Sequence, residues 1–196
     1  HEKLAHYAKE AYDVQYDFTC LGGYQEVEGI HQRGDWDLTQ HAKFSGQKLD
    51  WFDQKTNTRF IPHIMETSVG LNRLVLAVID NAYTEEDLKE GKSRVVLKLP
   101  YSLAPIKAAI FPLQKDDKLR DIASKLYHDL KKEIAVEYDD SGNIGKMYRR
   151  QDEIGTPYCI TVDYQTTEDN TVTIRNRDTM QQERVLLSEV QKIVTR

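Results

Sequence analysis

The sequence has little cysteine and no recognisable metal-ligand spacing. Its two cysteines, Cys20 and Cys159, lie far apart and form no CxxC pair. This spacing argues against a disulfide framework and fits a reducing compartment, so we expect both residues to be buried as small apolar side chains. The histidines show no HxxxH or Cys-His spacing, which argues against a structural zinc site. They stand at positions 1, 6, 31, 41, 63 and 128.

The chain also lacks a long apolar run, a signal-peptide pattern and an excess of basic residues. No stretch approaches the roughly 18 apolar residues of a membrane span, and the first residues do not read as a secretory signal. The formal net charge of −5 excludes a broad basic field but not a local nucleic-acid-binding patch. No initiator methionine is present, so we expect the sequence to be a piece of a longer protein.

What remains is an ordinary soluble globular composition, 196 residues long with 39% hydrophobic and 30% charged residues. Apolar spacing predicts a mixture of strands and helices in the first half. The expected strands are 14–18, 25–32, 49–52, 59–65 and 94–99. The expected helices are 2–12, 38–44 and 71–83. The charged stretch 84–92 has the composition of a linker, and we expect a domain boundary near residue 103.

The second half alternates strand and helix and then continues with further strands. The expected strands are 107–113, 135–138, 157–164, 171–175 and 183–187. The expected helices are 116–132, 144–153 and 188–194. This order predicts a mixed sheet covered by helices. No internal repeat is visible.

A short polar segment stands where an expected strand meets an expected helix. Glu66 ends the strand, Ser68 and Gly70 make a tight turn, and Arg73 lies in the first helical turn. An arginine there can meet phosphate oxygens, a carboxylate can hold a metal ion bound to those phosphates, and the helix N-terminus favours anions. The same spacing also fits a strand, turn and helix with only a surface ion pair. Upstream, Glu26 stands two residues before another glutamate, which predicts one shared strand face.

A basic segment lies on the expected helix at 144–153. Arg149 and Arg150, with a lysine and a tyrosine nearby, can contact phosphates and stack a base. The interleaved acidic residues fit a solvated helix face equally well. Arg175 and Arg177 form a second polar cluster near the end of a strand.

Many short motifs occur together in one order along the chain. They are His6-Tyr7-Ala8-Lys9; Glu26-x-Glu28-Gly29-Ile30 with Arg33 and Asp37-Leu38; Pro62-His63; Glu66-x-Ser68-x-Gly70-x-x-Arg73; Leu103-Ala104-Pro105-Ile106-Lys107; Tyr138-Asp139-Asp140; Ile144-Gly145-Lys146; Tyr148 to Pro157; and Val172-Thr173 with Arg175 and Arg177-Asp178-Thr179-Met180. From residue 2 to 196 the chain resembles the C-terminal part of the glycyl-tRNA synthetases of the homodimeric class II type. The segment from Glu66 to Arg73 is similar to class II motif 3.

The resemblance implies a fold and an activity. Residues 1–102 would be the C-terminal part of the class II antiparallel catalytic sheet (α+β). Residues 103–196 would be an α/β anticodon-binding domain with a mixed sheet covered by helices. The family couples glycine to tRNA-Gly with ATP and Mg²⁺ through a glycyl-adenylate. A homodimer of the full-length protein and a cytoplasmic location are also implied, without a membrane.

The resemblance also assigns roles to residues. Glu26 would face the ammonium group of glycine, and Glu66 would hold that ammonium group or Mg²⁺ bound to ATP. Ser68 would help to close a pocket with no room for a Cβ, and Arg73 would grip the γ-phosphate of ATP. The candidates for tRNA contact would be Arg149, Arg150, Arg175 and Arg177.

The chain departs from the family pattern in several places. Thr67 stands where the family usually has proline, and Asn72 stands where it has aspartate. Motif 1 and motif 2, with its arginine for the α-phosphate, do not occur in the sequence. We therefore expect the chain alone not to activate glycine. Two alternatives stay open: a non-catalytic synthetase-like nucleic-acid-binding accessory protein, and an interaction domain without a tRNA role.

Overall fold

The structure is a computed structural model that describes residues 4–88 and 91–195. The chain separates into two compact units, His1–Asp80 and Asn81–Arg196, and each is described by itself. Among the described residues, no helix has the length and hydropathy that crossing a bilayer requires.

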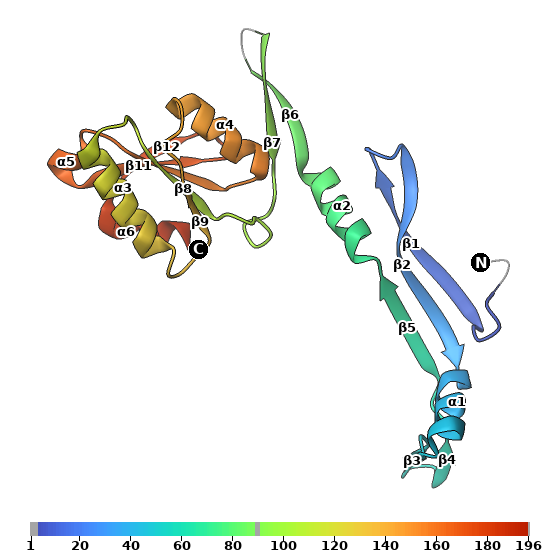
Figure 1. Ribbon diagram of the computed structural model, residues 1–196. Coiled ribbons are helices and arrows are strands. Elements are labelled where there is room, and N and C mark those ends of the chain that lie inside the picture. The colour runs from blue at the N-terminus through green and yellow to red at the C-terminus, as the bar shows by residue number, and fades with distance from the viewer. Residues whose placement is uncertain (1–3, 89–90, 196) are drawn as a thin grey trace. The chain divides into compact units, whose positions relative to one another are not determined.

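An antiparallel sheet organises the first unit, as the resemblance implies (Figure 1). Within the described residues its three strands have the order β1-β2-β5. The elements along the chain are β1 (Glu10–Phe18), β2 (Gly23–Gly34), α1 (Trp36–Ser45), β3 (Trp51–Asp53), β4 (Thr58–Phe60), β5 (Ile64–Val69) and α2 (Leu71–Ala82). Strands β3 and β4 form a separate hairpin, in the region where one was expected.

The expected helix at residues 2–12 is wrong. Its first two residues lie outside the described part of the chain; residues 4–9 form no helix, and β1 begins at Glu10. Strand β1 pairs with β2 along its whole length, and the Lys9 amide extends the ladder by donating to the Gln32 carbonyl at 2.7 Å. These sheet hydrogen bonds override the local helical spacing of apolar residues.

The two cysteines have different environments. Cys159 is buried, as expected, and burial raises the pKa of its thiol to about 12. Cys20 is exposed, so the expectation of burial is wrong for it. It lies in the turn between β1 and β2, where the amides of Thr19 and Cys20 donate to the Asp80 carboxylate at 3.0 and 2.9 Å. The Asp80 carboxylate fixes this turn through the two backbone amides. That interaction does not require the Cys20 thiol to be buried.

The charged stretch 84–92 is not a linker, although two of its residues lie outside the described part. Strand β6 (Tyr83–Leu88) pairs antiparallel with β7 (Lys92–Leu97). The side chains of β6 alternate between exposed and half-buried, so charged residues there follow a strand period. The hairpin belongs to the second compact unit. The domain boundary near residue 103 stays a prediction.

The second unit contains the mixed sheet that the sequence predicts. In its described part, five strands have the order β12-β11-β10-β8-β9. Strand β8 is parallel to β9 and β10, whereas β10–β11 and β11–β12 are antiparallel. The elements are β8 (Ala108–Pro112), α3 (Asp117–Leu130), β9 (Val136–Tyr138), α4 (Ile144–Ile154), β10 (Tyr158–Val162), α5 (Thr166–Asp169), β11 (Thr171–Asn176), β12 (Gln182–Leu186) and α6 (Leu187–Val194).

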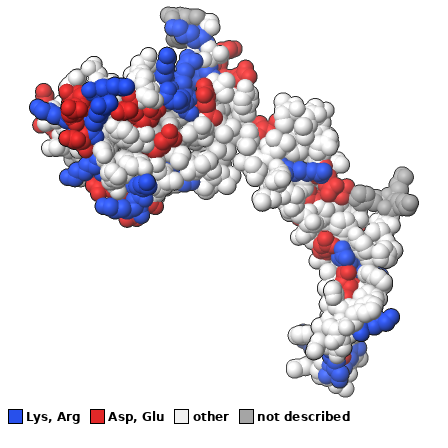
Figure 2. Space-filling view, viewed as in Figure 1, with Lys and Arg blue, Asp and Glu red and all other residues white. Residues whose placement is uncertain are grey.

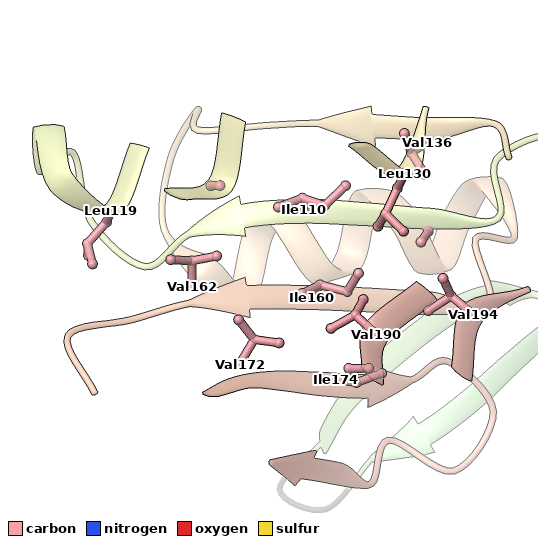
Figure 3. Packing of buried hydrophobic residues seen from close by; sticks show 12 residues of the cluster. Ile110, Leu119, Leu130, Val136, Ile160, Val162, Val172, Ile174, Val190 and Val194 are labelled. Carbon is pink, nitrogen blue, oxygen red and sulfur yellow. The ribbon is translucent and has the colours of Figure 1, made fainter. Parts of the chain in front are cut away.

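Helices cover both faces of this sheet. Ile110 and Ile160 point to one face and pack with apolar residues of α3 and α6, such as Leu119 and Val190 (Figure 3). The intervening strand residues point the other way. Ala109, Phe111 and Cys159 pack there against Met147 of α4. This alternation explains why β8 is buried at every position: it is a central strand with both faces covered.

Helix α4 ends in a tightly packed corner. Gly155 takes a left-handed conformation (φ 83°), and the Thr156 amide donates to the Gln151 carbonyl at 2.9 Å. The buried Thr156 hydroxyl also donates to Gln151 Oε1 at 2.6 Å. A Cβ at Gly155 would lie 2.9 Å from the Leu97 carbonyl oxygen. The helix end therefore lies directly against the end of β7, and only glycine fits there.

Replacing Gly155 by alanine is expected to destabilise the second unit. The free energy of unfolding should fall by about 1–3 kcal/mol more than in a Gly142→Ala variant, because only Gly155 adds a collision to the strain. Gly142 is the matched control, since its φ is also positive (101°) and no atom lies within 4 Å of the built Cβ. Urea unfolding followed by circular dichroism measures both losses. Equal losses would show that the contact with β7 does not matter.

Candidate functional site

A β-bulge in β2 turns Glu26 toward the candidate site. In the pairing with β1, Val14 lies opposite Glu28 and the next residue, Gln15, lies opposite Glu26. The extra residue, Val27, makes Glu26 and Glu28 face opposite sides of the sheet. The expectation that these two glutamates share one face is therefore wrong, because a bulge interrupts the strand period.

The same face of the sheet carries the other predicted residues of the amino-acid site. Gly29 lies opposite Ser68 of β5, and His31 lies opposite Glu66. A Cβ at Gly29 would lie 3.7 Å from Glu26 Oε1, so the Glu26 carboxylate leans over the glycine. The structure thus brings Glu26, Ser68 and Glu66 to one face, around a position that has no side chain. The sequence motif contains Gly29, but its spacing alone does not predict this position beside Glu26.

Arg73 reaches the bulge from the first turn of α2. The Gly70 amide donates to the carbonyl of Val27 at 3.2 Å, which joins the turn before α2 to the bulge. Arg73 Nη1 donates to the Glu26 carbonyl at 2.6 Å and lies 4.0 Å from Glu26 Oε2. The arginine side chain is about half exposed. It can therefore exchange these contacts for an anionic group that arrives from solvent.

Glu66 is held by an arginine that the sequence motifs contain but to which we gave no role. Arg33 Nη1 donates to Glu66 Oε2, while its Nε and Nη2 donate to Asp37 at 2.6 and 2.9 Å. The guanidinium group also lies 4.0 Å from the ring centre of Tyr7. Hydrogen bonds from Arg33 keep the pKa of Asp37 below its ordinary value. The sequence signal for this pair is the spacing of four residues between Arg33 and Asp37.

The charge distribution suits an ammonium group next to a polyphosphate. Glu26 and Glu66 supply negative charge, and Arg73 supplies positive charge at the edge of the same face. In the described residues, no group of three or more His, Cys, Asp or Glu side chains is placed to hold a metal ion. A single carboxylate such as Glu66 is nevertheless compatible with Mg²⁺, which proteins often hold through one or two carboxylates and the substrate's phosphates.

The four arginines proposed for RNA contact divide into two groups. Arg149 and Arg150 lie exposed on α4, where Figure 2 shows lysine and arginine side chains gathered. Within the described part of the chain, Arg149 makes no side-chain hydrogen bond or ion pair. Arg150 binds the loop before α4, through Asp139 and the Ser141 carbonyl, the latter at 2.6 Å. Although partial burial acts to raise the pKa of Asp139, hydrogen bonds from Ser141 and Arg150 lower it below its ordinary value.

Arg175 and Arg177 are buried and are held by protein groups. Arg175 donates to both oxygens of Asp152, at 2.8 and 3.0 Å. Arg177 donates to the carbonyls of Gly155 and Leu99 at 2.7 and 2.8 Å, and it also pairs with Asp178. This geometry supports a structural role for both arginines and argues against direct contact with RNA.

A third buried arginine, Arg94 of β7, was not predicted from the sequence. It is 3% exposed and donates to Asp152 at 3.1 Å, to the Arg177 carbonyl at 3.0 Å and to Glu86 at 2.6 Å. Asp152, which is 1% exposed, thus binds one arginine from the hairpin and one from β11. Nothing in the local sequence distinguishes Arg94 from a solvated strand residue.

The chain is similar to one domain family and to several curated proteins. Residues 107–196 match a family described as "Anticodon binding domain". Over 190 residues the chain is 54% identical to the glycine–tRNA ligase of Borrelia garinii subsp. bavariensis, covering 96% of this chain and 42% of the relative. The corresponding enzyme of Chlorobaculum tepidum is 50% identical over 189 residues, which is 96% of this chain and 40% of the relative. That of Thermobifida fusca is 48% identical over 200 residues (97% and 42%).

The chain is homologous to glycine–tRNA ligases. It spans about two fifths of the length of these curated relatives. The anticodon-binding match covers the whole five-stranded sheet with its helices, β8 to α6, in the described part of the second unit. The β6–β7 hairpin lies before that match, although Arg94 joins it to the matched segment.

Neutralising Asp152 is expected to unfold or strongly destabilise the second unit. An Asp152→Asn variant leaves buried Arg175 without a countercharge and removes one of the two carboxylates that bind buried Arg94, so the free energy of unfolding should fall by about 3–5 kcal/mol. Thermal unfolding of the whole chain measures the loss. Asp178→Asn is the matched control, because its carboxylate is half exposed and its arginine keeps two carbonyl partners. That variant should lose no more than about 1 kcal/mol. A small loss in both variants would contradict the structural role of Asp152.

Proposed function

We propose that this chain is part of a glycine–tRNA ligase. Its first unit contributes to the site for glycine and ATP, and its second unit binds the anticodon region of tRNA-Gly. The observation that carries the proposal is the collection of Glu26, Ser68 and Glu66 on one sheet face around Gly29, in a chain about half identical to glycine–tRNA ligases. The homodimer and the cytoplasmic location stay predictions.

The first unit would bind and orient glycine. The carboxylates of Glu26 and Glu66 attract the ammonium group, and the Ser68 hydroxyl lies across from Gly29 to limit the space. Larger amino acids are rejected because a side chain has no room beside these groups, whereas a purely apolar pocket separates amino acids poorly by one methyl group. Arg33 holds Glu66 in place while this binding occurs.

The reaction joins the glycine carboxylate to the α-phosphorus of ATP, and pyrophosphate leaves. Arg73, at the first turn of α2, would bind the γ-phosphate and so orient the leaving group. Mg²⁺ bound to the phosphates, with Glu66 as a ligand, would neutralise part of their charge. These residues bind and orient substrates, and the group that stabilises the α-phosphate lies in motif 2, which this sequence lacks.

The chain alone is therefore expected to give no glycine-dependent exchange of pyrophosphate into ATP. Without motif 2, the attack on the α-phosphate lacks its main electrostatic stabilisation. The measurement is the ATP–pyrophosphate exchange rate of the purified chain, with an intact glycine–tRNA ligase assayed beside it. An exchange rate close to that of the intact enzyme would overturn this expectation.

The second unit would contact RNA through the exposed face of α4. Arg149 and Lys146 present side chains without protein partners among the described residues, so both are available for phosphate groups. Arg150 already donates to Asp139 and to the Ser141 carbonyl in the loop between β9 and α4, so it is less free to bind a phosphate group. Arg175 and Arg177 would support this surface from inside rather than contact the RNA.

Binding of the chain to tRNA-Gly should weaken as salt rises, and Arg149→Ala should reduce the slope of log K against log salt by about 1. The change removes one phosphate contact and leaves the fold intact. Lys125→Ala on α3, at the opposite face of the sheet, removes the same charge and should leave the slope unchanged. Binding titrations at several salt concentrations, with a non-cognate tRNA in parallel, measure the effect.

Three other outcomes would redirect the proposal. Equal, weak binding to both tRNAs would mean that selectivity requires protein beyond this chain. Absence of binding would remove the tRNA role of the second unit and favour an interaction domain. Selective binding that Arg149→Ala leaves unchanged would move the RNA surface away from α4.

A further inference from the structure

We propose that His31 contacts the amino-acid substrate directly, by accepting a hydrogen bond at Nδ1 from the substrate's ammonium group. The proposal rests on the function proposed above and adds a binding residue to the glycine site. His31 Nδ1 is buried and has no hydrogen-bond partner in the described part of the structure. A buried acceptor without a partner is costly, so it indicates either a ligand or an ordered water at this position.

The position of the imidazole identifies the group that it would meet. The ring lies on the site face of β2, opposite Glu66, and leans along the strand over Gly29. A Cβ at Gly29 would lie 2.8 Å from His31 Cε1, 3.6 Å from its Nδ1 and 3.7 Å from Glu26 Oε1. The unpaired nitrogen and the Glu26 carboxylate therefore flank the same position, the one that has no side chain.

The chemistry of this position suits an ammonium group. An ammonium group has three N–H donors and no acceptor, and it is best held by several acceptors around it. Glu26 supplies a carboxylate, and Ser68 supplies a hydroxyl from the opposite strand. A neutral His31 with its proton on Nε2 supplies a further acceptor at Nδ1. Because χ2 of histidine has a broad energy well, a small rotation of the ring can present Nδ1 to an incoming donor.

The same imidazole also limits the size of the substrate. Its Cε1 already lies too close to Gly29 for a Cβ to be added there without movement of the ring. The ring therefore fills space that a smaller residue would leave open. His31 would thus combine a polar contact to the ammonium group with a steric wall, which a carboxylate alone does not supply.

The test compares three substitutions in the full-length protein that contains this segment. His31→Phe keeps a ring but removes the acceptor, and should raise KM for glycine about tenfold in ATP–pyrophosphate exchange while KM for ATP stays unchanged. His31→Asn places an amide oxygen close to the position of Nδ1 and should keep KM for glycine within about threefold. His31→Gln places its amide nearer the position of Nε2 and should behave like the phenylalanine variant.

His128→Phe is the matched control, since this histidine is exposed on α3 of the second unit. It should leave both KM values unchanged. A His31→Phe enzyme with the parent's KM for glycine would overturn the inference but leave the proposed function intact. A parent protein without glycine-dependent exchange would instead overturn the proposed function, and the inference with it.

A second measurement does not depend on the stability of any variant. In the unsubstituted full-length protein with ¹⁵N-labelled histidine, glycine should shift the Nδ1 resonance of His31. The other histidines of the protein serve as internal references. An Nδ1 resonance of His31 that saturating glycine leaves in place would overturn the inference.

Discussion

The buried carboxylate of Asp152 is the constraint on which the second unit depends. It lies on α4 and binds Arg94 from the β6–β7 hairpin and Arg175 from β11, which joins three elements far apart in the sequence. Removing these charges from water is expensive, and the cost is offset only because each carboxylate oxygen accepts hydrogen bonds in good geometry. The β6–β7 hairpin consequently packs with residues 107–196, which match the anticodon-binding family. The orientation of α4 follows, and with it the direction in which Arg149 faces.

In the first unit, a single extra strand residue determines how the candidate site residues are placed. The bulge at Val27 reverses the side of the sheet to which Glu26 points, and the Gly70 amide binds the carbonyl of the same bulge. One feature of the backbone thus sets the position of Glu26 and the start of α2, which carries Arg73. Bulges commonly re-aim a side chain in this way. Here the bulge places Glu26 on the face of the candidate site and Glu28 on the opposite face.

The sequence predicts well those features that depend on local periodicity. Most helices and strands after Glu10 lie where apolar spacing places them, and β8 shows the continuous burial of a central strand. The motif around Glu66 predicted the following helix correctly, but the prediction that the strand ends at Glu66 and that Ser68 belongs to the turn is wrong. Strand β5 continues to Val69, because its pairing with β2 extends through Ser68, and only Gly70 separates it from α2. The bulge, the burial of Arg94 and the unpaired nitrogen of His31 were not predictable. Each depends on which residue lies across the sheet or in a neighbouring element, and a single sequence does not contain that information.

The candidate arginines show how burial decides between two roles that a motif cannot separate. Arg177 already donates from Nε and both terminal nitrogens to protein acceptors, and Arg175 is bound to both oxygens of one carboxylate. Transferring such a group to a phosphate would break a buried ion pair, which costs about 3–5 kcal/mol. An exposed arginine gives up at most an ion pair worth about 1 kcal/mol or less. The exposed guanidinium of Arg149 could therefore bind RNA without this cost, as proposed above, whereas the buried arginines keep α4 in place.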